Sequence, residues 1–437
     1  MVRILFLIWV VMGHYCGYSQ QKYRIHDAEG FDFVLDVSVK DSIIEGYTRK
    51  KALLDYASRF QYGAIKFFSS LQYPEIIRFK ATIRKGKFEG KYHFLFSEYK
   101  IVGNIEQDSV FYGLYDKNNT LFKHFKGEKV ADYQRKDYKS SKEDLIKTTE
   151  ENIYDPKIVN SKKWQKFKKK MRQNSAVIAD DLELQIGFFA LIRSFDFSHY
   201  YLVKRMQQSV GNEKNFSLEE IDKDIAVLKI RKFSGKKSEM ELLVDSIYHK
   251  QYQCLIIDLR DNPGGNFETA LPLAHFLTDK ELVCGFLPNR KWYENNNRLP
   301  NESDIADFNL FKEGTMQEFN AQSSSKFGVV IQTQGTKHKF NGRVYFLVNE
   351  QTGSTAEALV IGVKEHHLGK IIGKQTAGSL LNAQSFPLDE DMMLLVPTND
   401  FISFKGYRVD KKGIQPDIRI KNQDALEYTI RLIHRDE

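Results

Sequence analysis

Residues 254–265 read Cys-Leu-Ile-Ile-Asp-Leu-Arg-Asp-Asn-Pro-Gly-Gly. The nearly continuous apolar run at the start is typical of a strand that is buried on both faces of a parallel sheet. The Pro-Gly-Gly segment then predicts a turn. Apolar residues recur at helical spacing over residues 270–277, so Pro272 has to fall in the first turn of a helix or kink it. The stretch therefore predicts a strand, a loop and a helix in succession.

The same pattern recurs on both sides of this stretch. Residues 224–230 and residues 344–348 predict further strands, the second of them strongly apolar. Helical spacing over residues 356–363 and a short apolar strand over residues 370–372 complete the series. Alternating strands and helices imply right-handed crossovers and a largely parallel sheet, so we expect an α/β core. A polar insert, residues 285–341, interrupts this core as either a lid with binding loops or a disordered decoration.

The N-terminal part has a different pattern. Between residues 21 and 130, short segments rich in β-forming residues alternate with turn signals, which predicts an antiparallel meander or a small sandwich with some helix around residues 48–71. The period becomes helical over residues 140–194. We therefore divide the chain into a signal peptide (residues 1–19), a mostly-β domain (residues 20–135), a helical subdomain (residues 136–210) and an α/β core (residues 211–437).

The first residues predict export. Arg3 precedes an apolar run, residues 4–12, and small and polar residues follow, which is the layout of a secretory signal peptide. We expect a periplasmic or extracellular protein with no integral membrane span, since no later stretch is long and apolar enough for one. After cleavage two cysteines remain, Cys254 and Cys284, which form one disulfide or stay free and cannot make a structural zinc site alone.

The net charge of +8 allows an anionic partner. Much of the excess lies in residues 162–172, where Trp164, Phe167 and Met171 recur at helical spacing. We interpret this run as an amphipathic helix with a solvated basic face, and a membrane-surface or polyanion site is the alternative. We expect no nucleic acid partner, no cofactor and no bound metal, and the oligomeric state is open.

Two loops stand at the carboxyl ends of predicted strands, where α/β sheets bind ligands. In the second loop Ser354 falls at the start of a helix, and the N–H of Thr355 would point the same way and could stabilise an oxyanion. The alternative is that Ser354 is only a helix cap, with Glu357 as its capping-box partner. In the first loop Gly264 and Gly265 allow a close backbone approach and could supply the second oxyanion donor.

A serine nucleophile also needs a base. Lys370 and Lys374 lie near the third strand, and several histidines lie at helix ends. His199 differs from these because it follows Ser198 at the point where the helical region ends. The local sequence alone does not place His199 beside Ser354.

Four segments, in this order, resemble the motifs of the tail-specific, or C-terminal-processing, serine peptidases. The first is the Asp-Leu-Arg-Asp-Asn-Pro-Gly-Gly run that ends at Gly265. Residues 353–357 (Gly-Ser-Thr-Ala-Glu) resemble the nucleophile segment, residues 373–378 (Gly-Lys-Gln-Thr-Ala-Gly) the Gly-x-x-Thr-x-Gly turn, and residues 413–417 (Gly-Ile-Gln-Pro-Asp) the closing motif. The resemblance runs from about residue 140 to the C-terminus. It implies a crotonase/ClpP-like core with βαβ crossovers, preceded by a helical subdomain.

The resemblance also implies which residues act. The family's Ser-Lys dyad places a lysine where this chain has Ser379, so that design is absent. The design of tricorn protease is a Ser-His-Ser-Glu tetrad, which this chain matches with Ser354, His199 and Ser198. The acid, three residues before the closing motif, is Asp410. Because Asp is one methylene shorter than Glu, we expect a backbone shift of about an ångström there.

Most relatives carry a PDZ module before the core, and the interval between His199 and Ile225 is too short for one. The resemblance as a whole implies an exported serine endopeptidase that cuts peptides or unfolded proteins through an acyl-enzyme on Ser354. A non-catalytic relative that binds peptides or lipids in the same cleft, and an esterase, are the alternatives.

Overall fold

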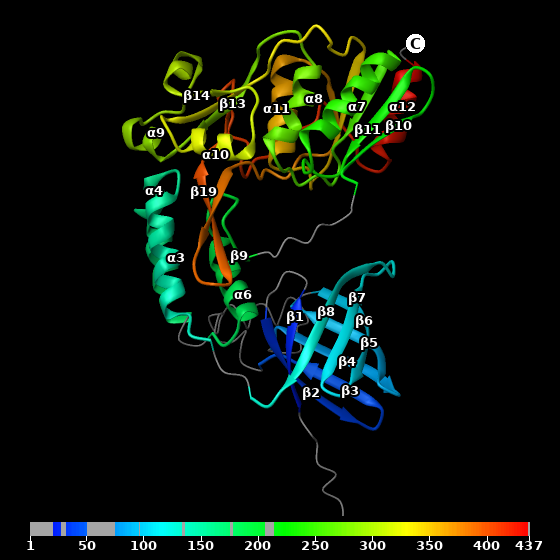
Figure 1. Cartoon of the computed structure of the whole chain (residues 1–437), viewed down its shortest axis with the longest axis vertical. Coiled ribbons are helices and arrows are strands. Elements are labelled where there is room, and N and C mark those ends of the chain that lie inside the picture. The colour runs from blue at the N-terminus through cyan, green and yellow to red at the C-terminus, as the bar shows by residue number, and fades with distance from the viewer. Residues whose placement is uncertain are drawn as a thin grey trace, which may run out of the picture. The chain divides into compact units, whose positions relative to one another are not determined.

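The computed structural model describes residues 21–27, 32–49, 75–95, 97–132, 136–174, 178–205 and 214–435 (Figure 1). The predicted signal peptide and most of the helix expected around residues 48–71 lie outside these residues. The chain divides into two compact units, which we name the barrel unit (residues 1–143, 167–191 and 204–207) and the sheet unit (residues 144–166, 192–203 and 208–437). The domain boundaries at residues 135 and 210 stay a prediction.

Eight antiparallel strands form a closed barrel in the barrel unit (Figure 1). They are β1 (Gln21–Asp27), β2 (Asp32–Lys40), β3 (Ile43–Tyr47), β4 (Ile77–Arg84), β5 (Lys87–Phe94), β6 (Ser97–Glu106), β7 (Ser109–Tyr115) and β8 (Leu121–Val130). Each strand pairs with the next, and β1 pairs with β8 to close the ring. The predicted meander therefore closes on itself instead of forming a sandwich, which removes open sheet edges.

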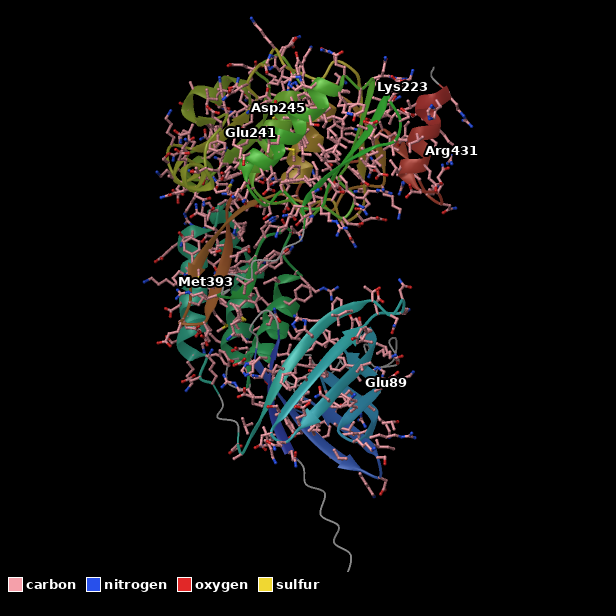
Figure 2. All side chains as sticks on the ribbon, turned by 45° about the vertical axis from the view of Figure 1, so that its right-hand side comes forward. Glu89, Lys223, Glu241, Asp245, Met393 and Arg431 are labelled. Atoms are coloured by element: carbon pink, nitrogen blue, oxygen red, sulfur yellow. The ribbon has the colours of Figure 1, made fainter. Side chains whose placement is uncertain are left out.

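Side chains alternate between the inside and the outside of this barrel, as the two-residue period of a strand requires. On β5, Phe88 and Tyr92 are buried inside, while Glu89 lies exposed on the outer face (Figure 2). The turn between β2 and β3 is only two residues long, and Asp41 and Ser42 both take positive φ angles of 47° and 65°. Such two-residue turns match the twist of the flanking strands.

A six-stranded sheet lies at the centre of the sheet unit, in the order β10-β11-β12-β16-β17-β21. Its strands are β10 (Phe216–Glu220), β11 (Ile225–Ile230), β12 (Cys254–Asp258), β16 (Arg343–Val348), β17 (Lys370–Gly373) and β21 (Ile418–Arg419). All neighbours from β11 onward pair in parallel, and β10 is the antiparallel edge. Every residue of β12 is buried, so the parallel core predicted from its apolar run is confirmed.

The crossover helices of this sheet are α7 (Lys237–Lys250), α8 (Phe267–Phe276) and α11 (Thr355–His366). Helices α8 and α11 are largely buried, because they pack between the sheet and further elements. Pro272 lies inside α8, beyond its first turn, so the first-turn position is wrong. The C-terminal helix α12 (Ala425–Arg435) packs with the opposite face of the sheet through Ile433 and Ala425.

The polar insert over residues 285–341 is largely ordered secondary structure, not a disordered decoration. It contains α9 (Arg290–Asn295), η1 (Glu302–Asp307), β14 (Asn309–Phe311), α10 (Met316–Ser323) and β15 (Gly328–Gln332). Strands β14 and β15 join β13 (Val283–Pro288) and β20 (Ile402–Ser403) in a second sheet. A third sheet contains β18 (Asn382–Pro387), β19 (Met392–Asn399) and β9 (Tyr201–Lys204). Cys254 and Cys284 are free thiols.

Helices α3 (Lys139–Asn152), α4 (Pro156–Val159), α5 (Lys162–Asn174) and α6 (Asp181–Ile192) make up the region predicted to be helical. Helix α5 contains the basic run, and its Trp164, Phe167 and Met171 are buried. The amphipathic interpretation of this run is therefore confirmed. Among the described residues, no helix is both long and apolar enough to cross a membrane.

Candidate active site

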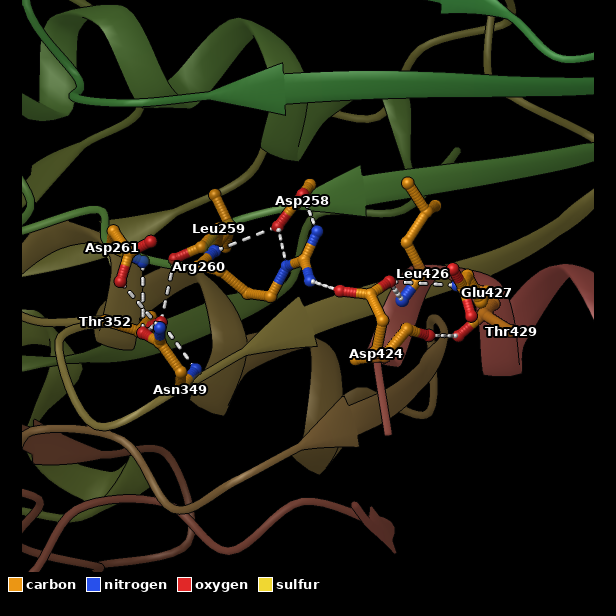
Figure 3. A network of polar contacts seen from close by, with 11 residues as sticks. Asp258, Leu259, Arg260, Asp261, Asn349, Thr352, Asp424, Leu426, Glu427 and Thr429 are labelled. Carbon is orange, nitrogen blue, oxygen red and sulfur yellow. Dashed lines mark hydrogen bonds and ion pairs between the residues drawn. The ribbon is translucent and has the colours of Figure 1, made fainter. Parts of the chain in front are cut away.

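Two loops meet at the carboxyl ends of β12 and β16, because these strands are direct neighbours in the parallel sheet. The Asp261 N–H donates to the Asn349 Oδ1 over 3.0 Å, and the Asn349 Nδ2 donates back to the Asp261 carboxylate over 2.7 Å (Figure 3). The Thr352 hydroxyl donates to the Leu259 carbonyl over 2.7 Å. These bonds hold the glycine loop and the serine loop in one fixed arrangement.

Arg260 anchors the base of the glycine loop (Figure 3). Its guanidinium donates to both oxygens of buried Asp258, at 2.9 and 2.7 Å, and to Asp424 at 2.7 Å. Two-point pairing of this kind fixes the direction of a guanidinium as well as its position. Arg260 therefore connects the glycine loop to the segment that leads into α12.

Ser354 stands immediately before α11 with φ 53° and ψ −126°. This backbone conformation is uncommon for a residue with a side chain and is a form of strain found at functional sites. The Ser354 hydroxyl makes no capping hydrogen bond to the helix. Ser354 therefore occupies the N-cap position of α11 but does not cap the helix through its hydroxyl, which is left for another partner.

Glu357 is fully buried one turn further along α11. Its carboxylate accepts from the Thr376 hydroxyl over 2.5 Å and from the N–H groups of Gly378 and Ser379 over 2.7 and 2.8 Å. Burial raises the pKa of Glu357, and these donors act in the opposite direction. Glu357 thus links α11 to the Gly-x-x-Thr-x-Gly turn. Both motifs are visible in the sequence, but the contact between them is not.

The structure brings Ser354, His199, Ser198 and Asp410 together within the sheet unit. The His199 Nε2 lies 3.3 Å from the Ser354 Oγ, and the His199 Nδ1 lies 2.7 Å from the Ser198 Oγ. The Ser198 hydroxyl donates to the Asp410 Oδ1 over 2.5 Å. Asp410 also accepts from the N–H of Ser198 and from the N–H of Leu380, both over 3.0 Å.

These contacts fix the direction of each proton. A carboxylate only accepts, so the single hydroxyl proton of Ser198 goes to Asp410. The Ser198 oxygen then accepts from the Nδ1–H of His199, which leaves the Nε2 lone pair facing Ser354. Burial lowers the pKa of His199 below its ordinary 6.5, the Asp410 charge opposes this, and Lys411 adds to it. A neutral imidazole with a free Nε2 is what a general base requires.

The glycine loop lies against Ser354. A Cβ added to Gly264 would lie 2.5 Å from the Ser354 Cβ, so this close approach excludes a side chain. The Gly264 N–H is already bonded to the Asn262 side chain over 2.8 Å. Within the described part of the chain, the N–H groups of Gly265 and Thr355 have no such partner. The two predicted glycines therefore differ, since only Gly265 keeps a free N–H.

Comparison with known proteins identifies the family of one part of the chain. The model of peptidase family S41 matches residues 224–420. This stretch is a peptidase S41 domain. The CtpA-like serine protease of Staphylococcus epidermidis is 22% identical over 198 residues, which are 45% of this chain and 34% of that protein. The carboxy-terminal processing protease CtpA of Bacillus subtilis is 24% identical over 204 residues, 46% and 36% of the two chains. The chain thus matches about a third of the length of these relatives.

Solved structures also resemble the chain. Tricorn protease aligns with a TM-score of 0.45 at 11% identity, over 92% of this chain and 46% of that chain. The photosystem II D1 C-terminal processing protease aligns with a TM-score of 0.44 at 10% identity, over 64% of this chain and 92% of that chain. The match to the S41 domain begins after Ser198 and His199, so the two residues that contact Asp410 and Ser354 lie outside it.

A small apolar pocket of the S41 domain opens beside Thr355, the residue after Ser354. Its volume is about 20 Å³, and Phe267 and Leu271 of α8, Leu359 of α11 and the Cys284 thiol line it. Burial raises the pKa of the Cys284 thiol to about 12, so this wall is neutral. The sequence did not reveal this pocket, because its walls come from two helices and the ordered insert.

The lysines considered from the sequence lie elsewhere. Lys374 forms an ion pair with Glu350 at 2.8 Å, and Lys370 is an exposed residue at the start of β17. The position of the family's dyad lysine is Ser379, whose carbonyl accepts from the Ser354 N–H over 2.8 Å. Among the described residues, His199 is the side chain with a basic nitrogen that contacts Ser354.

Proposed function

We propose that this chain is a serine endopeptidase that hydrolyses peptides or unfolded proteins through an acyl-enzyme on Ser354. The observation that carries the proposal is the unbroken hydrogen-bond series Asp410, Ser198, His199, Ser354, which ends in a lone pair aimed at the serine hydroxyl. The S41 domain supports the same conclusion. We further propose that the parallel sheet is a crotonase/ClpP-like core.

The proposed reaction follows the logic of a serine triad with one more residue. His199 takes the Ser354 hydroxyl proton as Oγ attacks the peptide carbonyl, and the N–H groups of Gly265 and Thr355 hold the developing oxyanion. His199 then gives the proton to the leaving amine, and an acyl ester remains on Ser354. Water, deprotonated by His199, attacks this ester and releases the acid. Ser198 and Asp410 hold the imidazole in the required tautomer throughout.

We also propose that the protein is exported. Arg3 and the apolar run at residues 4–12 carry this proposal, as the layout of a secretory signal peptide. Labelling of intact cells, or of culture supernatant, with an antibody against the S41 domain would test it. Protein found only inside the cell membrane would contradict export.

The peptidase proposal is tested by a fluorophosphonate probe followed by peptide mapping. We expect one covalent adduct, on Ser354, and its loss in Ser354→Ala. A digest of a mixed peptide library then separates peptide from ester hydrolysis. Absence of any adduct in the folded wild type would support a non-catalytic relative, and an adduct with ester but no peptide cleavage would support an esterase.

A further inference from the structure

A buried cluster of polar side chains joins the polar insert to the segment that carries Asp410. Asp400, in the loop between β19 and β20, is fully buried. Its carboxylate accepts from the Tyr293 hydroxyl of α9 and from the Arg408 guanidinium, both over 2.5 Å. The same guanidinium donates to the Tyr293 oxygen over 3.2 Å. We name Tyr293, Asp400 and Arg408 the Arg408 cluster, and the reaction proposed above uses none of these side chains.

The charges make the Arg408 cluster rigid. Burial raises the pKa of Asp400 above its ordinary value, and the Arg408 charge and the Tyr293 hydroxyl oppose this. Burial and the Asp400 charge also raise the pKa of Tyr293, so its hydroxyl keeps its proton and can donate. A buried carboxylate that loses its partners is costly, so the three side chains are held together.

Arg408 lies two residues before Asp410, and Val409 between them is fully buried. On the other side of Asp410, the Lys411 N–H donates to the Gly378 carbonyl over 2.7 Å. The backbone at Asp410 is therefore fixed from both directions, by the Arg408 cluster and by the Gly-x-x-Thr-x-Gly turn.

Tyr154 shows that the Arg408 cluster and Asp410 are neighbours in space. Its ring packs edge-on against the Tyr293 ring, with the centroids 5.6 Å apart. Burial raises the pKa of Tyr154, the charges of Asp400 and Asp410 add to this, and the Arg408 charge opposes it. One buried hydroxyl thus lies within electrostatic range of both the cluster and the acid that contacts Ser198.

We propose that Tyr293, Asp400 and Arg408 are positioning residues that hold the Asp410 carboxylate within hydrogen-bond reach of Ser198. The proposal rests on the serine mechanism proposed above. A small displacement of an orienting group can lower the rate of a reaction strongly. Because Tyr293 belongs to α9, the polar insert acquires a role in the reaction that involves no contact with the substrate.

The first test is Tyr293→Phe, which changes no charge and keeps the ring that packs against Tyr154. We expect the rate constant for fluorophosphonate labelling of Ser354 to fall about fivefold or more, with the protein still folded by circular dichroism. The pKa of His199, followed by NMR titration in a Ser354→Ala background, should also fall. The reason is that the Asp410 charge raises the pKa of His199, and a displaced carboxylate raises it less.

The matched control is Tyr252→Phe. The Tyr252 hydroxyl also donates to a carboxylate, that of Glu220, over 2.7 Å, but this pair joins the residues that follow α7 to the edge strand β10. We expect Tyr252→Phe to change neither the labelling rate nor the pKa of His199.

A double-mutant cycle separates positioning from a merely structural role. In an Asp410→Asn background, Tyr293→Phe should slow labelling no further, because the group that it positions has already lost its charge. Arg408→Lys keeps the charge but not the planar fork, so its labelling rate should lie between those of the wild type and Arg408→Gln.

The proposal is overturned if Tyr293→Phe leaves both the labelling rate and the pKa of His199 unchanged. It is also overturned if Tyr293→Phe slows labelling equally with and without Asp410→Asn. If the folded wild type takes no label while Tyr293→Phe still lowers the pKa of His199, the serine mechanism fails and the positioning of Asp410 stands.

Discussion

The Ser354 site and the barrel cavity are built on opposite principles. At the Ser354 site, buried Asp410 and Ser198 and half-buried His199 are hydrogen-bonded in series. In the barrel unit, by contrast, a cavity of about 480 Å³ is lined mainly by aromatic and aliphatic side chains such as Phe33, Ile77 and Leu114. A catalytic site needs fixed proton positions, whereas a binding cavity needs shape and an apolar lining. We therefore expect substitutions at the Ser354 site to act on the rate of the reaction.

The two sites also differ in how the chain assembles them. The barrel forms from eight strands that follow one another along the chain, so its strand pairs join neighbours in the sequence except for the β1–β8 pair that closes the ring. The Ser354 site needs residues that are 155 positions apart, as between His199 and Ser354, and 212 apart, as between Ser198 and Asp410. The Ser354 site therefore depends on contacts between segments that lie farther apart in the sequence than β1 and β8 of the barrel. The predictions below test whether its parts act as one unit.

The largest effect is expected from Ser354→Ala. Removing the nucleophile should lower kcat/KM for peptide cleavage by at least about 10⁴-fold. The matched control is Ser379→Ala, which removes a hydroxyl at the position of the family's dyad lysine and should change the rate little. A large loss in Ser379→Ala, with the protein still folded by circular dichroism, would mean that this hydroxyl takes part in the reaction.

Asp410→Asn should have an intermediate effect. The change removes the charge that holds Ser198, so we expect a loss of about 10- to 100-fold in kcat/KM, less than for the nucleophile. Asp410 raises the pKa of His199, so its removal should also move the acid limb of the pH profile to lower pH. An unchanged rate and profile would show that Asp410 has no part in orienting the base.

Filling the small pocket beside Thr355 should change substrate choice. The pocket is apolar and tight, so we expect a small apolar residue such as Ala before the cleaved bond. Cys284→Phe should lower kcat/KM for that substrate about tenfold or more, while fluorophosphonate labelling of Ser354 persists. Cys284→Ala is the matched control and should accept larger apolar residues. Equal cleavage profiles in the wild type and both variants would show that this pocket does not select the substrate.

The smallest effect is expected from Lys411→Gln. The general base acts only when neutral, and the lowered pKa of His199 places the acid limb of kcat/KM below pH 6.5. Lys411 contributes to this lowering, so its removal should raise the pKa and move the acid limb upward by less than about one pH unit. Lys412→Gln, at the neighbouring exposed position, should leave the profile in place. A downward shift in Lys411→Gln would contradict the assignment of His199 as the titrating group.

Much of the sheet unit could be predicted from sequence, for a physical reason. Fully buried strands such as β12 and β16 leave apolar runs, and the loops that follow them must lie at one edge of the sheet. That logic placed Ser354 beside Gly264 and Gly265. It did not predict which glycine keeps a free N–H, because the Gly264 amide is used by a side chain two residues away, Asn262.

Other features were beyond local reasoning. His199 follows no strand motif, and its position beside Ser354 results from the packing of a separate segment. The insert has a polar composition yet forms strands and helices, because Phe311 and Phe319 bury themselves in the core. The closure of the barrel depends on β1 pairing with β8, a contact between the ends of the meander that no local pattern records. Its cavity likewise carries no sequence motif.

The central claim is that His199 activates Ser354, and the rate of covalent labelling of Ser354 by a fluorophosphonate probe tests it most directly. The account predicts that His199→Ala, still folded, labels at least about 10³-fold more slowly than the wild type. The solvent-exposed His249→Ala is the control and should label at the wild-type rate. Equal labelling rates in His199→Ala and the wild type would contradict the account.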